Sequence, residues 1–141
     1  MKTLSLFAFI LFSMVAIQCS KESGPTEPVA DGIYGSWNWV ESVGGISGNN
    51  VLTPASVGYS VKINFLNNGT FQRFQNDSLQ ATTTFTVSRK KTSFHADTVN
   101  LIAYADSIHF MPQIIYSVTI DSLFLEDLYP DGLGHAYSRI K

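Results

Sequence analysis

The chain has 141 residues, of which 45% are hydrophobic and 14% are charged, and its formal net charge is −2. This length favours one domain with a substantial core, and the composition is that of a folded chain rather than a disordered one. There is no cationic surplus of the kind that marks a nucleic-acid-binding surface, so we expect no nucleic-acid partner. The short basic cluster Arg89-Lys90-Lys91 is interpreted as a solvated turn.

The first 18 residues have the pattern of a secretory signal peptide. Lys2 supplies a positive charge, and an apolar run from Leu4 to Ile17 follows it. The run is shorter than the stretch of about 20 apolar residues that a membrane-spanning helix needs. We therefore predict a signal peptide over residues 1–18. A buried N-terminal helix is the alternative.

The only cysteine, Cys19, directly follows this run. One cysteine cannot form a disulfide within the chain. The segment Val15-Ala16-Ile17-Gln18-Cys19 resembles the lipobox of bacterial lipoproteins, in the looser form of Bacteroidota, which implies cleavage before Cys19 and its acylation. The resemblance implies an outer-membrane lipoprotein of the cell envelope, held to the membrane by its lipid on the periplasmic side or at the cell surface. A freely secreted protein is the alternative.

Residues 19–32 are predicted to be the lipidated cysteine and a flexible tether. They contain Gly24, Pro25 and Pro28 and show no alternation of polar and apolar residues. The folded domain is therefore expected to comprise residues 33–141.

Most of this domain alternates polar and apolar residues with a period of two, which is typical of β-strands. The predicted strands are residues 36–46, 58–66, 70–77, 80–89, 97–104, 107–111, 113–121, 122–128 and 135–141. We interpret the sixth and seventh as one strand broken at Pro112, which leaves about eight strands.

The connections between these strands are short. Asn67-Asn68-Gly69 and Tyr129-Pro130-Asp131-Gly132 predict tight turns, and residues 44–56 predict one longer loop. The sequence thus predicts an all-β fold, a small antiparallel up-and-down β-barrel, with a β-sandwich as the alternative. An outer-membrane barrel is rejected because polar residues interrupt both faces of the strands.

Two short motifs at the ends of the domain resemble the calycin signature, which is shared by lipocalins and fatty-acid-binding proteins. They are Gly35-Ser36-Trp37 in the first strand and Tyr137-Ser138-Arg139 in the last. The resemblance implies a lipocalin-like barrel in which Trp37 closes one end and Arg139 lies across its indole, with Gly35 in the same signature. The last 22 residues also look like the end of small lipocalin-like lipoproteins of Bacteroidota. The alternative is that Trp37 is an ordinary core aromatic residue and Arg139 a surface charge.

The sequence shows no catalytic or metal-binding motif. His95, His109 and His135 are not spaced as metal ligands, and no nucleophile elbow or phosphate loop occurs. Asp127, Asp131 and His135 lie near the last turn, where a catalytic dyad is conceivable, but turn formation already explains Asp131. We therefore predict a protein that is not an enzyme and needs no cofactor and no metal.

The remaining function class is binding. A barrel of this size has room for packed side chains or for one small ligand. We predict a small, apolar ligand in the barrel, and the candidate interior residues are Phe65, Phe71, Phe85, Tyr116 and Val118. The loop of residues 44–56 is expected at the rim, where Ile46, Val51 and Leu52 suit an adaptable flap. The alternative is a packed β-domain without a cavity that contacts a protein partner, as an accessory or immunity-type lipoprotein; the sequence does not identify that partner.

Overall fold

The computed structural model describes residues 32–45 and 48–141. The predicted signal peptide, the predicted lipidation site Cys19 and the predicted tether up to residue 31 lie outside the described residues, as does Ile46 of the predicted flap.

The described residues form a nine-stranded sheet, a helical turn at residues 32–33 and a helix of four residues. The strands and the helix are β1 Gly35–Gly44, β2 Asn50–Leu52, α2 Pro54–Val57, β3 Val61–Phe65, β4 Thr70–Gln75, β5 Ser78–Lys91, β6 Thr98–Tyr104, β7 Gln113–Val118, β8 Ser122–Asp127 and β9 Leu133–Arg139. The prediction of an all-β fold is confirmed.

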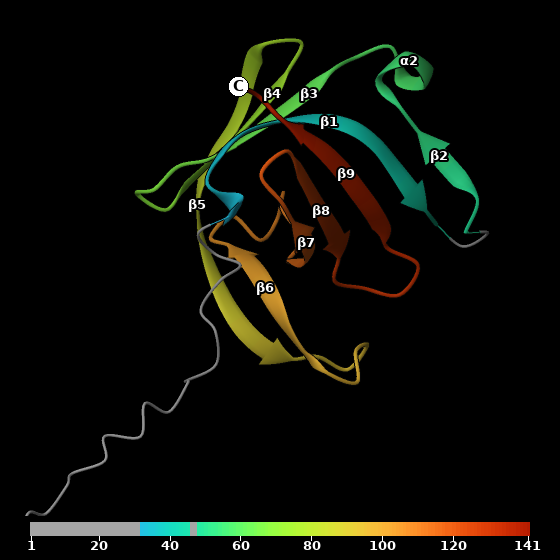
Figure 1. The fold of residues 1–141 in the computed structure, drawn as a ribbon, viewed down its shortest axis with the longest axis vertical. Helices are drawn as coiled ribbons and strands as arrows, with labels where there is room; N and C mark the ends of the chain where they lie inside the picture. The colour runs from blue at the N-terminus through green and yellow to red at the C-terminus, as the bar shows by residue number, and fades with distance from the viewer. Residues whose placement is uncertain (1–31, 46–47) are drawn as a thin grey trace, which may run out of the picture.

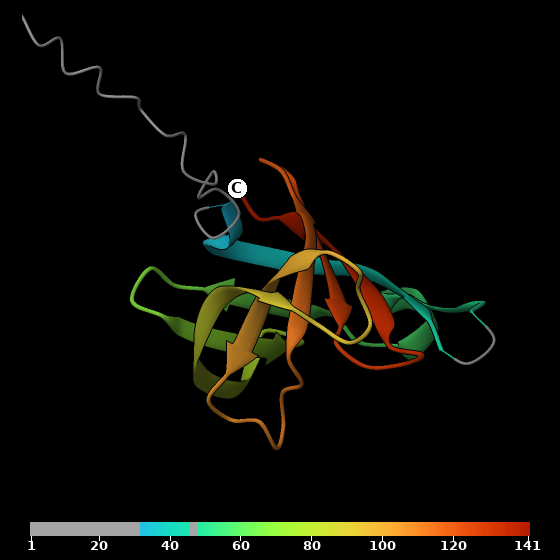
Figure 2. The same cartoon turned by 90° about the horizontal axis from the view of Figure 1, so that it is seen from below.

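The sheet closes on itself. Strands β3 to β9 pair antiparallel in chain order, and β1 pairs with β3 on one side and with β9 on the other. The result is a closed antiparallel barrel of eight strands, which confirms the predicted up-and-down barrel. The ninth strand, β2, pairs with the last residues of β1 and lies outside this closed circuit. Figure 1 shows β9 beside β1, and Figure 2 shows the ribbons curling around a common interior.

Two segments differ from the predicted strands. Residues 107–111 are not a strand, because Asp106 ends β6 in a turn: its carboxylate accepts the main-chain N–H groups of Ile108 and His109, and its carbonyl accepts that of Phe110. Such local bonds replace the ladder of a sheet. In the predicted long loop, in contrast, residues 50–52 form β2, and α2 follows with Thr53 as its N-cap.

The core is a line of touching aromatic rings in the barrel. Phe65 contacts Phe85 and Phe71, with ring centres 5.0 and 5.1 Å apart, and Phe71 contacts Tyr104 at 4.9 Å. Phe65 is 1% exposed, and Phe71, Phe85 and Tyr104 are also buried. Aromatic pairs at such distances stabilise a core beyond the area that they bury. These rings fill one part of the barrel and leave another part open.

Candidate ligand-binding site

One end of the barrel is closed by Trp37 together with the segment that precedes β1. Trp37 is fully buried, and its indole Nε1 donates a hydrogen bond to the carbonyl oxygen of Ile33 at 2.7 Å. Arg139 of β9 lies over the indole, with its guanidinium carbon 4.0 Å from the ring centre. We call the pairing of β1 with β9 at these two residues the seam, since Trp37 and Arg139 are also register partners there.

Arg139 further binds the main chain around the seam. Its Nη1 and Nη2 donate to the carbonyl oxygens of Tyr34 and Gly32 at 2.9 and 2.8 Å, and its Nε donates to that of Ile120. A Cβ atom at Gly35 would lie 2.7 Å from Arg139 Nη1, and Gly35 has a φ of +131°. Only glycine adopts this conformation without strain, so Gly35 is part of the same closure.

Four of the five predicted interior residues lie inside the barrel, but only one lines open space. Phe65 and Phe85 are buried in the aromatic core. Val118 is partly buried and packs against that core, and its side chain approaches Gly32. Phe71 is the one that lines the cavity described below.

Tyr116 lies outside the barrel, with 75% of its surface exposed, which corrects the prediction that it faces the interior. The cause is a β-bulge: Ile115 pairs with Leu125 but Ser117 pairs with Phe124, so Tyr116 is an extra residue in β7. A bulge interrupts the alternation of side chains between the two faces of a strand.

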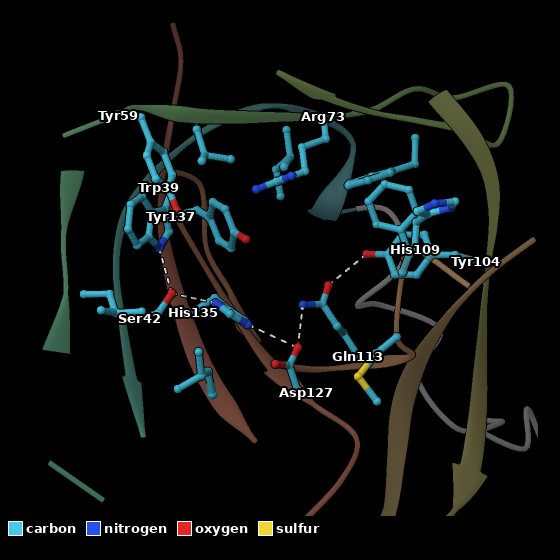
Figure 3. Close-up of a pocket in the computed structure, with 17 residues that line it drawn as sticks. Trp39, Ser42, Tyr59, Arg73, Tyr104, His109, Gln113, Asp127, His135 and Tyr137 are labelled. Atoms are coloured by element: carbon cyan, nitrogen blue, oxygen red, sulfur yellow. Dashed lines mark hydrogen bonds and ion pairs between the residues drawn. The ribbon is translucent and has the colours of Figure 1, made fainter. Parts of the chain in front are cut away.

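Next to Phe71 the barrel contains an open cavity of about 410 Å³. Ile63, Phe71, Phe110 and Leu133 contribute apolar wall, and Leu52 of β2 also lines the cavity, as part of the loop that we expected at the rim. Cavities of roughly 300–1,000 Å³ are typical of small-molecule sites. The wall of this one combines apolar side chains with polar ones such as Arg73 and Gln113. Figure 3 shows the side chains around this space.

A chain of hydrogen bonds runs along one side of the cavity (Figure 3). It comprises, in order, Trp39, Ser42, His135, Asp127, Gln113 and Tyr104. We call these six residues the polar chain.

The first half of the polar chain joins an indole, a hydroxyl, an imidazole and a carboxylate. Trp39 Nε1 lies 2.9 Å from Ser42 Oγ, which lies 2.7 Å from His135 Nδ1, and His135 Nε2 lies 3.1 Å from Asp127 Oδ1. An indole N–H can only donate, so the Ser42 hydroxyl is free to donate to His135. Each of these four groups therefore has a hydrogen-bond partner.

The second half of the polar chain converges on the same carboxylate. Tyr104 donates its hydroxyl proton to Gln113 Oε1 at 2.9 Å, and Gln113 Nε2 donates to Asp127 Oδ1 at 3.0 Å. Burial raises the pKa of Asp127, but the hydrogen bonds from His135 and Gln113 outweigh this, and the pKa lies below its usual range. Asp127 is therefore an ionised carboxylate that accepts hydrogen bonds from two side chains.

Two tyrosines of the cavity wall remain neutral. Burial raises the pKa of Tyr104 well above its usual value, and the nearby Tyr137 and Asp127 add to this. Burial likewise raises the pKa of Tyr137, Asp127 adds to the effect, and the charge of Arg73 opposes it. Both phenols are thus hydrogen-bonding groups rather than anions at neutral pH.

The structure brings together two of the three residues that we noted near the last turn. Asp127 and His135 are bonded to one another, whereas Asp131 is an exposed residue of the turn between β8 and β9, with a φ of +59°. His109, expected in a strand, lies in the turn before β7, where it bonds to Asp106 at 2.8 Å and reaches the cavity.

Sequence reasoning missed Arg73 and Ser42. A signal for Arg73 was present, since it follows Phe71 by two residues in β4 and so shares its inward face. No such signal exists for Ser42. The register of β1 against β9 shifts between Trp39 and Glu41, which turns Ser42 inward where plain alternation predicts Glu41.

The described residues thus form a small closed antiparallel β-barrel with an open cavity. Comparison with protein-family models, curated proteins and solved structures finds no match for the chain. Within residues 32–45 and 48–141, no helix is long and apolar enough to cross a membrane. The same residues contain no cluster of three or more histidine, cysteine or acidic side chains that could hold a metal ion.

Proposed function

We propose that this protein is a lipocalin-like binding protein that holds a small, largely apolar molecule in its barrel. The observation that carries this proposal is the open cavity of about 410 Å³. The aromatic core fills the neighbouring part of the barrel, and Phe71 belongs both to that core and to the cavity wall. Aliphatic and aromatic walls would bind a ligand by removing its apolar surface from water.

Binding, rather than catalysis, fits the polar chain better. The order hydroxyl, imidazole, carboxylate in Ser42, His135 and Asp127 is also that of a nucleophilic triad. However, Ser42 is only 3% exposed, and its Oγ contacts Trp39 as well as His135. We infer that these bonds fix the shape of the cavity wall and that Ser42 does not attack a substrate.

The binding proposal is tested with a neutral fluorescent probe, N-phenyl-1-naphthylamine, whose emission rises in apolar surroundings. We expect saturable binding to the purified protein. Val61→Phe fills the cavity, because Val61 lines it and is 8% exposed, and this variant should lose the signal. Val40→Phe is the matched control, since Val40 is 46% exposed on the outer face of β1. Equal binding by both variants would show that the probe does not enter the cavity.

We further propose that the barrel is attached to the bacterial envelope as an outer-membrane lipoprotein of the Bacteroidota type. The support is the lipobox-like segment that ends at Cys19 and the spacer-like residues that separate it from β1. Acyl chains bury methylene groups at ~0.8 kcal/mol each, so a multiply acylated cysteine is a stable anchor. Cells fed an alkyne fatty acid should label the protein and not its Cys19→Ser variant, and equal labelling of both would refute the assignment.

A second candidate function is contact with a protein partner. It is favoured by a groove on the outer face of the barrel, where Tyr116, Phe124 and Val43 are 75%, 42% and 39% exposed beside Glu41 and Glu126. If the naphthylamine probe does not bind, and a complex that the protein forms in the cell is lost in Tyr116→Ser, this second function replaces the first.

A further inference from the structure

Arg73 is a cation that faces the cavity without a counter-ion. It is half-buried in β4 and lines the open space. Among the described residues it takes part in none of the ion pairs, which involve other cations. Charged side chains that are withdrawn from water are normally paired. The N–H groups of Arg73 therefore have donor capacity that the described residues do not use.

Tyr137 offers a second unused donor in the same space. It lies in β9, is 9% exposed and lines the cavity. Its hydroxyl makes no hydrogen bond to another described residue, but the hydroxyl oxygen is not fully enclosed by protein atoms. The hydroxyl is thus accessible from the cavity, and Figure 3 shows it extending toward the space that Arg73 also faces.

Asp127 is the one carboxylate that lines the cavity, and it forms no ion pair with Arg73. Its Oδ1 instead accepts hydrogen bonds from His135 and Gln113 in the polar chain. His109, which also lines the cavity, is bonded to Asp106. The N–H groups of Arg73 are therefore available to a molecule that enters the cavity.

From this geometry we propose that the ligand is a small amphipathic carboxylate. This inference rests on the proposed binding function. Its carboxylate accepts hydrogen bonds from the guanidinium of Arg73 and from the hydroxyl of Tyr137, and its apolar body lies against Ile63, Phe71 and Phe110. A guanidinium presents paired N–H groups that match the two oxygens of a carboxylate.

The test compares decanoate with decan-1-ol, which share an alkyl chain and differ in charge. Each displaces N-phenyl-1-naphthylamine from the purified protein, and calorimetry gives the affinity. We expect Arg73→Met to weaken decanoate binding by roughly tenfold and to leave decanol within about twofold. Tyr137→Phe should weaken decanoate by a smaller factor. Lys62→Met is the control, because Lys62 is a cation on β3 that lies over Phe74 and does not line the cavity.

The outcomes separate this inference from the function on which it rests. If decanol and the naphthylamine bind but Arg73→Met leaves decanoate affinity unchanged, the carboxylate assignment is overturned and the binding function stands. If no probe enters the wild-type cavity, both are overturned. Thermal unfolding monitored by circular dichroism identifies any variant that loses binding because it no longer folds. For such a case Arg73→Lys, which keeps the charge but not the paired N–H groups, should give an intermediate affinity.

Discussion

The seam makes a quantitative prediction, because Arg139 is its central residue. In Arg139→Ala the guanidinium that lies 4.0 Å from the Trp37 ring is removed, together with its hydrogen bonds to the carbonyls of Tyr34, Gly32 and Ile120. The cation–π contact contributes ~0.5–2 kcal/mol. The bonds to Tyr34 and Gly32 are part-buried, and each is worth about 1 kcal/mol after water replaces the donor. The bond to Ile120 is exposed and contributes little.

The sum is a loss of ~2–4 kcal/mol in the free energy of unfolding. The assay is urea unfolding of the purified protein followed by circular dichroism. Arg139→Lys should recover less than half of the loss, because an ammonium cannot reach three carbonyls at once. Lys141→Ala is the control: Lys141 is an 86% exposed cation whose pair with Asp121 spans 3.5 Å, and its loss should stay within about 0.5 kcal/mol. A loss for Arg139→Ala as small as that of the control would refute the reasoning.

Three further predictions concern the glycine at the seam and the polar chain. In thermal melts, Gly35→Ala should cost ~2 kcal/mol or more because of the close approach to Arg139 Nη1, whereas Gly48→Ala, which has a φ of +66° and no neighbour within 4 Å, should cost ~1 kcal/mol. The pKa of Asp127 is lower in the folded chain than in the unfolded one, so its carboxylate stabilises the fold above the unfolded pKa, and this stabilisation is lost as the pH falls through the folded pKa. Asp127→Asn should therefore reduce the dependence of the unfolding free energy on pH as the pH falls below the ordinary pKa of an aspartate, about 3.9, and an unchanged slope contradicts the prediction. Ser42→Ala should lower the free energy of unfolding by ~1–3 kcal/mol, since it leaves Trp39 Nε1 and His135 Nδ1 unpaired. If the wild type hydrolyses p-nitrophenyl butyrate at all, Ser42→Ala should hydrolyse it at the same rate.

The closed barrel could be predicted from the sequence because its rules are local. A period of two along each segment and turn residues between them indicate sequential antiparallel strands, as in β3 and β4 around Asn67-Asn68-Gly69. Residues 107–111 show where local pattern misleads. They alternate like a strand, yet the carboxylate of Asp106 accepts the main-chain N–H groups of Ile108 and His109. Whether such a group bonds to a nearby side chain or to a neighbouring strand depends on the tertiary structure, which the local pattern does not contain.

The cavity could be predicted less well, because bulges decide which side chains face inward. The register shift between Ile115 and Ser117 places Tyr116 outside, and the shift between Trp39 and Glu41 turns Ser42 inside. No glycine or proline lies at either register shift, so the sequence gives no local signal of a bulge there. A bulge depends on how two strands twist against one another, so its position follows from the closed sheet rather than from the residues of one strand.

The seam and the cavity are parts of one strand face. His135, Tyr137 and Arg139 are spaced by two in β9, so all three side chains point toward the barrel interior. The first belongs to the polar chain, the second is the hydroxyl of the proposed carboxylate site, and the third binds Trp37. A slip of β9 by one residue would turn these three outward and Ala136 and Ser138 inward. Because Arg139 fixes the register against Trp37, the contact that closes the barrel also determines which groups a ligand meets inside it.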